Sequence, residues 1–371
     1  MRIFKGPRAH YVAYAIALAL MCEFVVRPAG AQDSHAAVKK GDKLVSAAER
    51  EKYLARSQIH SDTDVASKIV MEGPAGPGAF SFREEVDCVY EPDALPTGNS
   101  PKFACLDSAG KELKVKYGCN NGEVFGEVAA TRLLWLLGFE ADRMYPVIVR
   151  CRNCPPLPAA NPEENASGRF VCAAIERKAG EEIEAVLNQG WHWDEINKVS
   201  VAAGGASRAH IDALKLMAVL LQHNDSKPDN QRIVCTDDSW SADAANGENC
   251  SSPKLVVQDV GATFGGAGNR VREDSKVDLV HWREQRIWRD GSSCTANLAG
   301  STRSGTISDP VISEEGRAFL AGLLRKVRAS QIRDVFTVAQ VTTRDRGSTL
   351  EAWQSAFWYK AYQIINHRCS R

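Results

Sequence analysis

Long hydrophobic runs are rare in this chain of 371 residues. The most prominent, Tyr11–Val26, is shorter than the roughly 20 residues that a membrane-spanning helix needs, and no later segment is apolar enough to span a bilayer. An excess of one charge is also lacking, because Lys and Arg total 46 and Asp and Glu also total 46. This balance excludes the basic surface typical of nucleic-acid binding or of a polybasic membrane contact. We therefore expect no nucleic-acid partner and no stable membrane anchor.

Familiar motifs of hydrolytic and zinc chemistry are missing as well. Neither G-x-S-x-G nor H-E-x-x-H occurs, which argues against a hydrolase of either kind. Cys151-Arg152-Asn153-Cys154 is a C-x-x-C, but neither a second C-x-x-C nor paired His residues are present to complete a zinc site. We found no internal repeat and no low-complexity tract. The sequence thus gives little support to a metal-binding or redox role for this cysteine pair.

The first residues have the organisation of a secretory signal peptide. A basic start precedes the apolar run Tyr11–Val26, and Ala29-Gly30-Ala31 fits a small-residue cleavage site. A retained membrane anchor is the alternative, but Glu23 and Arg27 interrupt the far end of the run. We predict a signal peptide at residues 1–31 and export to the periplasm or the exterior. The remaining part, of about 340 residues, is long enough for two lobes.

Cysteine usage agrees with export. Of 11 cysteines, Cys22 would leave with the signal peptide, so an even number remains for up to five disulfides. The candidate pairs are Cys88 with Cys105, Cys151 with Cys154, Cys235 with Cys250, and Cys294 with Cys369. Other connectivities stay open, because spacing alone does not determine pairing.

The chain before residue 80 is predicted to be an extension and a linker. Residues 32–70 are polar, with a helical pattern over 47–59. Gly73–Gly78 cannot be helical, and its prolines remove amide donors that a phosphate-binding glycine loop would need. We prefer the linker interpretation of residues 32–80.

Residues 81–178 carry strand signals around one helix. A stripe of apolar residues predicts a helix over 123–137, which Gly138 ends. A hairpin turn is predicted at 108–111. The predicted strands are 85–90, 102–106 and 113–117 before the helix, and 145–150 and 169–175 after it.

Residues 179–371 are predicted to be mainly helical. An amphipathic helix over 207–222 delivers His223 at its end. Residues 233–234 and 255–257 predict a short strand pair, separated by an insert between Cys235 and Cys250. Further helices are predicted at 314–328 and 349–367.

The most specific motif is His223–Asn230, which reads H-x-D-x-K-P-x-N. Five fixed positions, each filled at about 1 in 20 by average usage, occur by chance in well under one per cent of chains of this length. Downstream, Gln258-Asp259-Val260-Gly261 contains D-x-G after an apolar run. The alternative is a loop in which Asp, Asn and Pro simply form a turn.

These motifs resemble those of the protein-kinase-like superfamily. The exported, cysteine-bearing character is similar to the secretory-pathway atypical kinases of the Golgi casein kinase type, and the compact second half is similar to kinases related to the HipA toxins. The resemblance covers roughly residues 80–270. It implies a two-lobed α+β fold, stabilised by disulfides, with an antiparallel-sheet N-lobe at 81–178 and a helical C-lobe at 179–371.

The resemblance also implies residue roles. Asp225 would be the base that accepts the proton of the attacking hydroxyl, and Lys227 would offset charge on the γ-phosphate of ATP. Asn230 and Asp259 would hold Mg²⁺, with Mn²⁺ as an alternative ion.

Two further residues would position the nucleotide phosphates. Lys116, preferred over Lys114 on the same strand face, would contact them, paired with Glu127 rather than Glu123 on the following helix. Glu176 begins the segment where backbone groups would meet adenine.

The chain departs from the usual kinase pattern in several places. Asn224 replaces the Arg of H-R-D, Val260 replaces the Phe of D-F-G, and no A-P-E follows. Asn230 and Asp259 are separated by a long insert. A glycine-rich loop is not recognisable, and residues 97–100 are the best candidate for its place.

We therefore predict an exported, ATP- and Mg²⁺-dependent phosphotransferase that acts as a Ser/Thr protein kinase. One alternative is a small-molecule or sugar kinase, or an enzyme that transfers AMP. A second is a non-catalytic, pseudokinase-like binding module. The expected partners are a nucleotide and a hydroxyl-bearing acceptor, most simply a protein.

Overall fold

The computed structural model describes residues 43–94, 100–158, 160–236, 239–243, 247–265, 277–291, 293–298 and 306–369. Within these ranges, no helix combines the length and the apolar character needed to cross a membrane. The predicted signal peptide at 1–31 lies outside the described residues, as do residues 97–99 of the candidate nucleotide loop.

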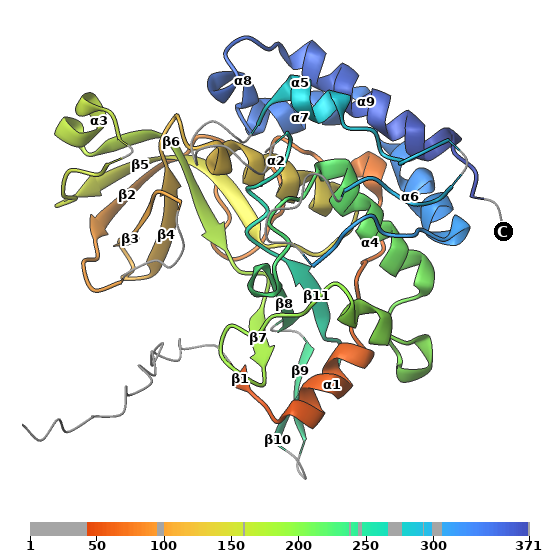
Figure 1. Ribbon diagram of the computed structural model, residues 1–371. Helices are drawn as coiled ribbons and strands as arrows, with labels where there is room; N and C mark the ends of the chain where they lie inside the picture. The colour runs from red at the N-terminus through yellow and green to blue at the C-terminus, as the bar shows by residue number, and fades with distance from the viewer. Residues whose placement is uncertain are drawn as a thin grey trace, which may run out of the picture. The chain divides into compact units, whose positions relative to one another are not determined.

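Five strands close into a barrel in the order β2-β3-β4-β6-β5 (Figure 1). They are β2 (Glu85–Tyr90), β3 (Lys102–Leu106), β4 (Glu112–Tyr117), β5 (Arg143–Arg152) and β6 (Arg169–Arg177). Neighbours are antiparallel except β2 and β5, whose parallel pairing closes the barrel. The sequence predicted a fully antiparallel sheet, and the parallel pairing of β2 with β5 shows that this prediction was wrong for one pair of strands. β5 is longer than predicted, and residues 148–152 at its end pair with β2.

Alternation along β4 separates the inside of the barrel from its outer face. Leu113, Val115 and Tyr117 are buried in a cluster of apolar side chains inside the barrel. Lys114 and Lys116 lie on the opposite face of the strand, because successive side chains in a strand alternate. The strand therefore presents both lysines outside the barrel core.

The predicted hairpin between β3 and β4 is confirmed. Asp107 Oδ1 accepts hydrogen bonds of 2.9 Å from the amides of Ala109 and Lys111. The short Asp side chain accepts hydrogen bonds from amide groups that have no backbone carbonyl partner within the tight turn.

Helix α2 (Gly122–Leu136) follows β4 and confirms the helix predicted there, one residue earlier at each end. Asn121 caps it by accepting a hydrogen bond from the Glu123 amide. Nearly all of its residues are buried, and it packs against both β5 and α7 (Ala329–Val338). α2 thereby belongs to the main apolar core, which is separate from the cluster inside the barrel.

A second, four-stranded sheet has the order β1-β7-β8-β11. Its strands are β1 (Lys43–Leu44), β7 (Glu181–Glu184), β8 (Gln231–Cys235) and β11 (Lys254–Val257). β8 and β11 form the predicted strand pair, with Gln231 opposite Val257. A small hairpin of β9 (Trp240–Asp243) and β10 (Gly247–Cys250) forms part of the insert between them.

Helix α4 (Arg208–Leu221) is the predicted helix that precedes the H-x-D-x-K-P-x-N motif. Ser207 caps its start, and Gln222 ends it in a left-handed conformation with φ of 56°. α4 packs against α6 (Glu314–Lys326), which, with α9 (Leu350–Asn366), confirms the predicted tail helices.

Several elements were not predicted from the sequence. α7 buries Ile332, Val335 and Phe336 on one face, a pattern that the sequence contained. The others are β1, β7, β9, β10, α3 (Pro162–Ser167), α5 (Leu279–Glu284) and α8 (Val341–Arg344). Most of these are too short for periodicity to reveal them.

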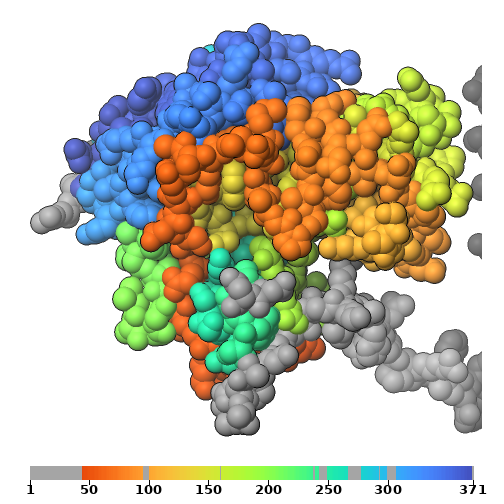
Figure 2. All heavy atoms as spheres, turned by 180° about the vertical axis from the view of Figure 1, so that it is seen from behind, coloured from red at the N-terminus to blue at the C-terminus, as the bar shows by residue number. Residues whose placement is uncertain are grey.

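The segment before the barrel is part of the fold rather than a loose extension. α1 (Ala47–Ala55) ends four residues earlier than predicted, because Gln58 pairs with Lys254 beside the second sheet. Ile59, Val65 and Val70 are then buried in the main core. Figure 2 shows this segment, in orange, along one face of the molecule. Gly73–Gly78 contains no helix, as predicted, but the Pro74 carbonyl accepts a 2.8 Å hydrogen bond from the Tyr145 hydroxyl, so it is not a free linker.

Five disulfides link the ten cysteines after residue 31. Four are the predicted candidate pairs, and the fifth joins Cys119 to Cys172. Disulfides of this number are typical of an oxidising compartment outside the cytoplasm. The described residues form one compact unit of mixed α+β class. Its division into two lobes at residue 178 stays a prediction.

Candidate active site

Lys116 lies at the centre of a cluster of charged residues. Its Nζ is 2.6 Å from Glu127 Oε2 on α2 and 2.7 Å from Asp259 Oδ1. Glu123 is farther away, at 3.9 Å. The expected ion pair between Lys116 and Glu127 is therefore present, and it forms because Glu127 lies one turn inside a helix that follows the strand directly.

Lys114 has different partners, although it shares a strand face with Lys116. Its Nζ lies 2.6 Å from Glu176 Oε2, directly across the β4–β6 pair. Lys178 Nζ lies 3.4 Å from the other oxygen of the same carboxylate. Burial acts to raise the pKa of Glu176, but the two ammonium groups outweigh it and hold that pKa below its usual range. Glu176 is thus an ionised member of a network beside the Lys116 cluster.

Asp259 remains accessible while its partners do not. Its side chain is 39% exposed, whereas Lys116 and Glu127 are each 1% exposed. Partial burial acts to raise the pKa of Asp259, but the Lys116 ammonium holds it well below the usual range. Asp259 is also left-handed, with φ of 49°, a conformation that Asp tolerates better than most residues. The turn after β11 therefore holds an ionised, reachable carboxylate.

Two carboxylates share the Lys116 ammonium in this cluster, and Lys114 and Lys102 act on Asp259 as well. One ammonium, Lys116, faces Glu127 and Asp259 within 2.7 Å. Burial raises the pKa of Glu127 to about 7, Lys116 opposes this rise, and Asp259 adds to it. Asp259 is the ionised and accessible carboxylate of the cluster, and its oxygens are of the hard type that a divalent cation prefers.

The H-x-D-x-K-P-x-N residues form a loop that is bonded to the same turn. The Asn224 amide donates to the Ala262 carbonyl at 2.9 Å, and the Gln258 amide donates to the Asn230 carbonyl at 2.9 Å. Asn230 Nδ2 donates to the Asp225 carbonyl at 2.7 Å, which fixes the amide within the loop. The structure thereby brings this loop to the turn that carries Asp259.

Lys227 lies among carboxylates of the loop. Its Nζ is 3.9 Å from Asp225 Oδ2 and 3.5 Å from Asp229 Oδ2. Partial burial acts to lower its pKa, but Asp225 and Asp229 raise the pKa above the usual value. Lys227 therefore remains a cation next to the proposed base.

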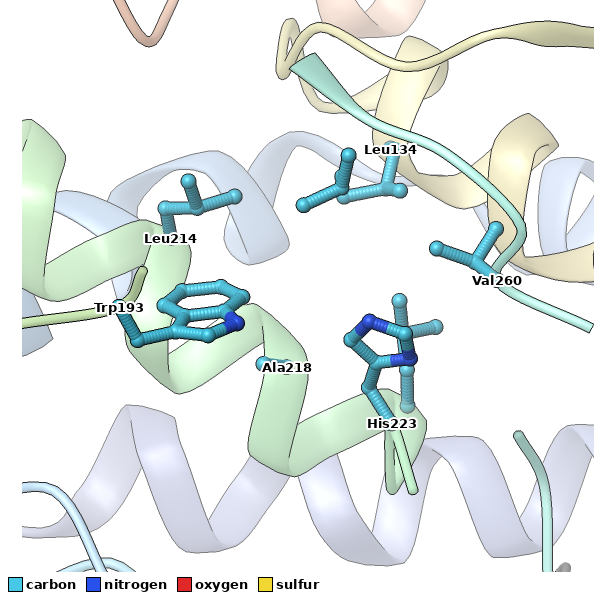
Figure 3. Close-up of a pocket in the computed structure, with 8 residues that line it drawn as sticks. Leu134, Trp193, Leu214, Ala218, His223 and Val260 are labelled. Atoms are coloured by element: carbon cyan, nitrogen blue, oxygen red, sulfur yellow. The ribbon is translucent and has the colours of Figure 1, made fainter. Parts of the chain in front are cut away.

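His223 precedes the loop and is fully buried. It lines a cavity of about 10 Å³, with Leu134 and Val260 among the apolar walls (Figure 3). Burial lowers the pKa of His223 to about 4, so its ring is neutral at pH 7. The residue anchors the loop to the core and has no charge to offer a ligand.

Two glycines let α2 approach the D-x-G turn. A Cβ added to Gly126 would lie 2.6 Å from the Gly261 carbonyl oxygen, and one added to Gly261 would lie 2.8 Å from Glu123 Cγ. The sequence analysis missed Gly126. An isolated Gly inside a helical pattern is a signal of this kind of close packing.

The segment after β6 has intramolecular partners. Asp142 Oδ1 accepts a 2.9 Å hydrogen bond from the Ala179 amide, and Arg143 Nη2 donates to the Lys178 carbonyl at 3.3 Å. These are backbone groups of the segment predicted to meet adenine. The sequence did not identify Asp142 or Arg143, because a contact between β5 and this segment leaves no local pattern.

The insert between Asn230 and Asp259 is held by the Cys235–Cys250 disulfide. Cys235 ends β8, whereas Asn230 directly precedes its start. The disulfide therefore lies at the opposite end of the strand pair from the site.

No protein-family model and no curated protein matches this sequence. Among solved structures, the proinflammatory kinase CtkA of Helicobacter pylori aligns over 76% of this chain and 93% of that chain. The identity is 10% and the TM-score is 0.39, values at which the alignment decides neither family nor activity.

Proposed function

We propose that this protein is an exported, ATP- and Mg²⁺-dependent phosphotransferase of the protein-kinase-like superfamily, acting on Ser or Thr hydroxyls of proteins. The observation that carries the proposal is the position of Lys116, which contacts Glu127 and Asp259 at once. The position of one long helix, α2, after the third barrel strand supports it, because this is the order of a kinase N-lobe; the short helix α3 between β5 and β6 is an addition to that order.

Phosphoryl transfer needs positioning and charge neutralisation more than covalent chemistry. Lys116 would contact nucleotide phosphates, and Glu127 would hold its ammonium in place. Asp225 would orient the acceptor hydroxyl and take its proton, while Lys227 would neutralise the transferred group. These roles fit side chains that lie on one loop and one strand bonded to a common turn.

The residues present fit a divalent cation. Asp259 is ionised and accessible, and Asn230 directs its amide nitrogen to the Asp225 carbonyl, which leaves Oδ1 to serve as a ligand. Both are hard oxygen ligands of the type that Mg²⁺ prefers, and Mn²⁺ accepts them too. When bound, such an ion would neutralise charge on the phosphates.

A transfer assay tests the proposal. The mature protein would be incubated with Mg²⁺, dephosphorylated casein and ATP labelled at the γ-position. We expect label in casein or in the protein itself, and a loss of at least about 100-fold in Asp225→Asn, which keeps the shape but not the base. Asp229→Asn is the matched control, because this exposed carboxylate lies in the same loop and contacts the same Lys227.

Labelling from the α-position instead would identify AMP transfer, and labelling of a sugar alone would identify a small-molecule kinase. Equal activity in wild type and Asp225→Asn would contradict the assignment of the base.

Export is proposed on the disulfides together with the signal-like start of the sequence. Mass spectrometry of the non-reduced protein from its native host should find cleavage after Ala31 and ten oxidised cysteines. Ten free thiols, or an intact residue 1, would contradict export.

A pseudokinase-like module is the second candidate, and one observation favours it. The Lys178 carbonyl and the Ala179 amide are bonded to side chains of this protein rather than left for a base. A thermal-shift assay with Mg²⁺ and ATP separates the two, since a catalytic kinase must be stabilised by nucleotide.

A further inference from the structure

A cavity of about 970 Å³ lies beside the segment that follows β6. Its walls include Pro74–Pro77, the C-terminal half of α2, the start of β5 and residues 176–180. Lys116, Glu127, Asp225 and Asp259 are not among its lining residues. The cavity therefore lies apart from the residues proposed to contact the phosphates and the acceptor, although it shares Lys114 and residues 176–180, the segment predicted to meet adenine, with the proposed nucleotide site.

Arg132 of α2 is the unusual residue of this wall. Its side chain is 1% exposed, and none of its three guanidinium nitrogens has a hydrogen-bond partner among the described residues. Burial lowers its pKa to about 10, and the nearby Tyr145 opposes this shift, so the group stays charged at neutral pH. A buried charge without a hydrogen-bond partner destabilises the folded protein.

Gly73 and Tyr145 pack closely around this guanidinium. Gly73 has φ of +79° and lies against the Arg132 guanidinium, where no space remains for a Cβ. The Tyr145 ring lies 5.8 Å from the Arg132 Cζ. The cation is thus enclosed by the strand β5 and by the Gly- and Pro-rich segment, neither of which supplies an acceptor in the described part of the chain.

Two more arginines line the same cavity and donate to carbonyl groups, and Arg143 also has the Tyr145 hydroxyl as a partner. Arg143 donates to the carbonyls of Ala75 and Lys178 at 3.4 and 3.3 Å, and Arg177 Nε donates to Gly78 at 3.0 Å. No described carboxylate forms an ion pair within 4.0 Å of Arg132, Arg143 or Arg177.

Three of the four acidic residues that line the cavity have cationic partners within 4.0 Å, and the fourth, Glu112, is exposed. Glu140 pairs with Lys254 at 2.9 Å, and Asp142 pairs with Lys178 at 3.3 Å. Glu176 pairs with Lys114 at 2.6 Å. Their charges are therefore largely offset, and the arginines leave the cavity with a local positive excess.

We propose that this cavity binds a small organic anion that carries phosphate or carboxylate groups, with Arg132 and Arg143 as its charged contacts. Guanidinium groups match both anions, because their planar donors bind two oxygens at once. Binding of such an anion would offset the free-energy cost of burying the Arg132 guanidinium without a hydrogen-bond partner. The segment Gly73–Gly78, which lies against Arg132 and Arg143, is the part that would adjust when the anion enters.

Calorimetric titration of the metal-free, nucleotide-free mature protein tests the proposal, with inorganic pyrophosphate and citrate as probes. We expect at least one probe to bind, and its Kd to rise about tenfold or more in both Arg132→Gln and Arg143→Gln. Binding of pyrophosphate alone assigns phosphate chemistry, and binding of citrate alone assigns carboxylate chemistry. Arg333→Gln, an exposed arginine of α7 paired with Glu351, is the matched control and should bind as the wild type does.

Arg143 is only half-buried, so Arg143→Gln keeps the test valid if Arg132→Gln fails to fold. The proposal is overturned if neither probe binds the folded wild type at millimolar concentration, or if both arginine variants bind normally. It is also overturned if ATP displaces the probe competitively and Lys116→Met abolishes probe binding, because the cavity would then belong to the nucleotide site. Absence of phosphoryl transfer would contradict the proposed function but leave this result unchanged.

Discussion

The barrel and the helical region differ in what holds them together. Three of the five disulfides join cysteines in or next to the barrel strands: Cys88–Cys105, Cys119–Cys172 and Cys151–Cys154. The helical region instead contains a large aromatic cluster, in which Trp282 stacks on Trp353 at 5.6 Å beside Phe336. A barrel of five short strands encloses few side chains, and covalent links compensate for a small apolar core.

The comparison matters for the site because the site draws on both regions. Lys116 comes from a barrel strand, whereas Glu127 lies on α2, which belongs to the main core. Asp259 follows β11 of the second sheet. The contact at Lys116 is therefore where the two regions meet, and changes to either region should be felt there.

The largest loss of phosphoryl transfer is expected when the contact between Lys116 and Asp259 is removed by substitution of either residue. Lys116→Met removes the ammonium group on the barrel strand β4, and Asp259→Ala removes the carboxylate that follows β11. Each should lower phosphoryl transfer by at least about 100-fold, since Lys116 would neutralise charge on the phosphates and Asp259 would hold the divalent cation that does the same. The double variant should be hardly worse than either single one, because residues that act as a unit are not additive.

Initial rates with ATP labelled at the γ-position measure this cycle. Strictly additive losses would show that the two residues act separately. Melting temperatures of all three variants provide the control for folding.

The second largest effect should come from removing disulfides, and it should differ between the barrel and the helical region. In the chain-entropy model, Cys119–Cys172 and Cys294–Cys369 close loops of 53 and 75 residues, worth about 4 kcal/mol each. Replacing either pair by Ser should lower the melting temperature, and the two decreases should be similar in size. Only the Cys119 and Cys172 variant should also lower activity of the remaining folded protein, because both cysteines lie two or three residues from Lys116 or from its strand partner Ala174.

Activity at a temperature where both variants are folded is the measurement. Equal loss of activity in both variants would show that the barrel has no special dependence on its links.

The sequence predicted much of the barrel and of the site because the signals there are local. Alternation at 113–117 separates Lys116 from the core, and helical spacing puts Glu127 near it. The closure of the barrel was not predictable, since the pairing of β2 with β5 joins residues far apart in the chain. The burial of residues 54–70 was missed for a similar reason, because a polar segment with isolated apolar residues resembles a linker until its partners are known.

Arg132, a residue of the proposed anion site, shows the same limit. In the sequence it is one of many charged residues on a helix, and a charged residue on a helix is usually solvated. Its burial follows from the packing of Gly73 and Tyr145 against α2, which no local pattern records.

A smaller effect is expected where α2 meets the D-x-G turn. Gly126→Ala would place a Cβ 2.6 Å from a backbone oxygen of Gly261, which must shift, at a cost of about 2 kcal/mol. Gly322→Ala is the matched control, because it lies within α6 and its Cβ would meet no atom within 4 Å. There the change should stabilise the protein by about 0.5–1 kcal/mol through helix propensity. Urea denaturation of both variants measures the difference, and a stabilising Gly126→Ala would contradict the close approach.

The smallest effect concerns a second buried lysine, Lys360 of α9, which like Lys116 is 0% exposed. Burial acts to lower the pKa of both, but Asp259 and Glu127 raise that of Lys116 well above its usual value. Lys360 contacts the carbonyls of Trp282 and Gln285, and burial lowers its pKa to about 7.

Its folded-state pKa lies below the unfolded value of 10.5, so between about pH 7 and 10 the unfolded chain binds more protons and stability rises with pH. Lys360→Met should reduce this rise by up to about 1 kcal/mol per pH unit, whereas Lys326→Met, an exposed lysine at the end of α6, should not. Urea denaturation at pH 7, 8 and 9 gives both slopes. An unchanged slope in Lys360→Met would mean that this lysine keeps its proton in the folded protein, and that the helical region, like the barrel, tolerates a buried cation.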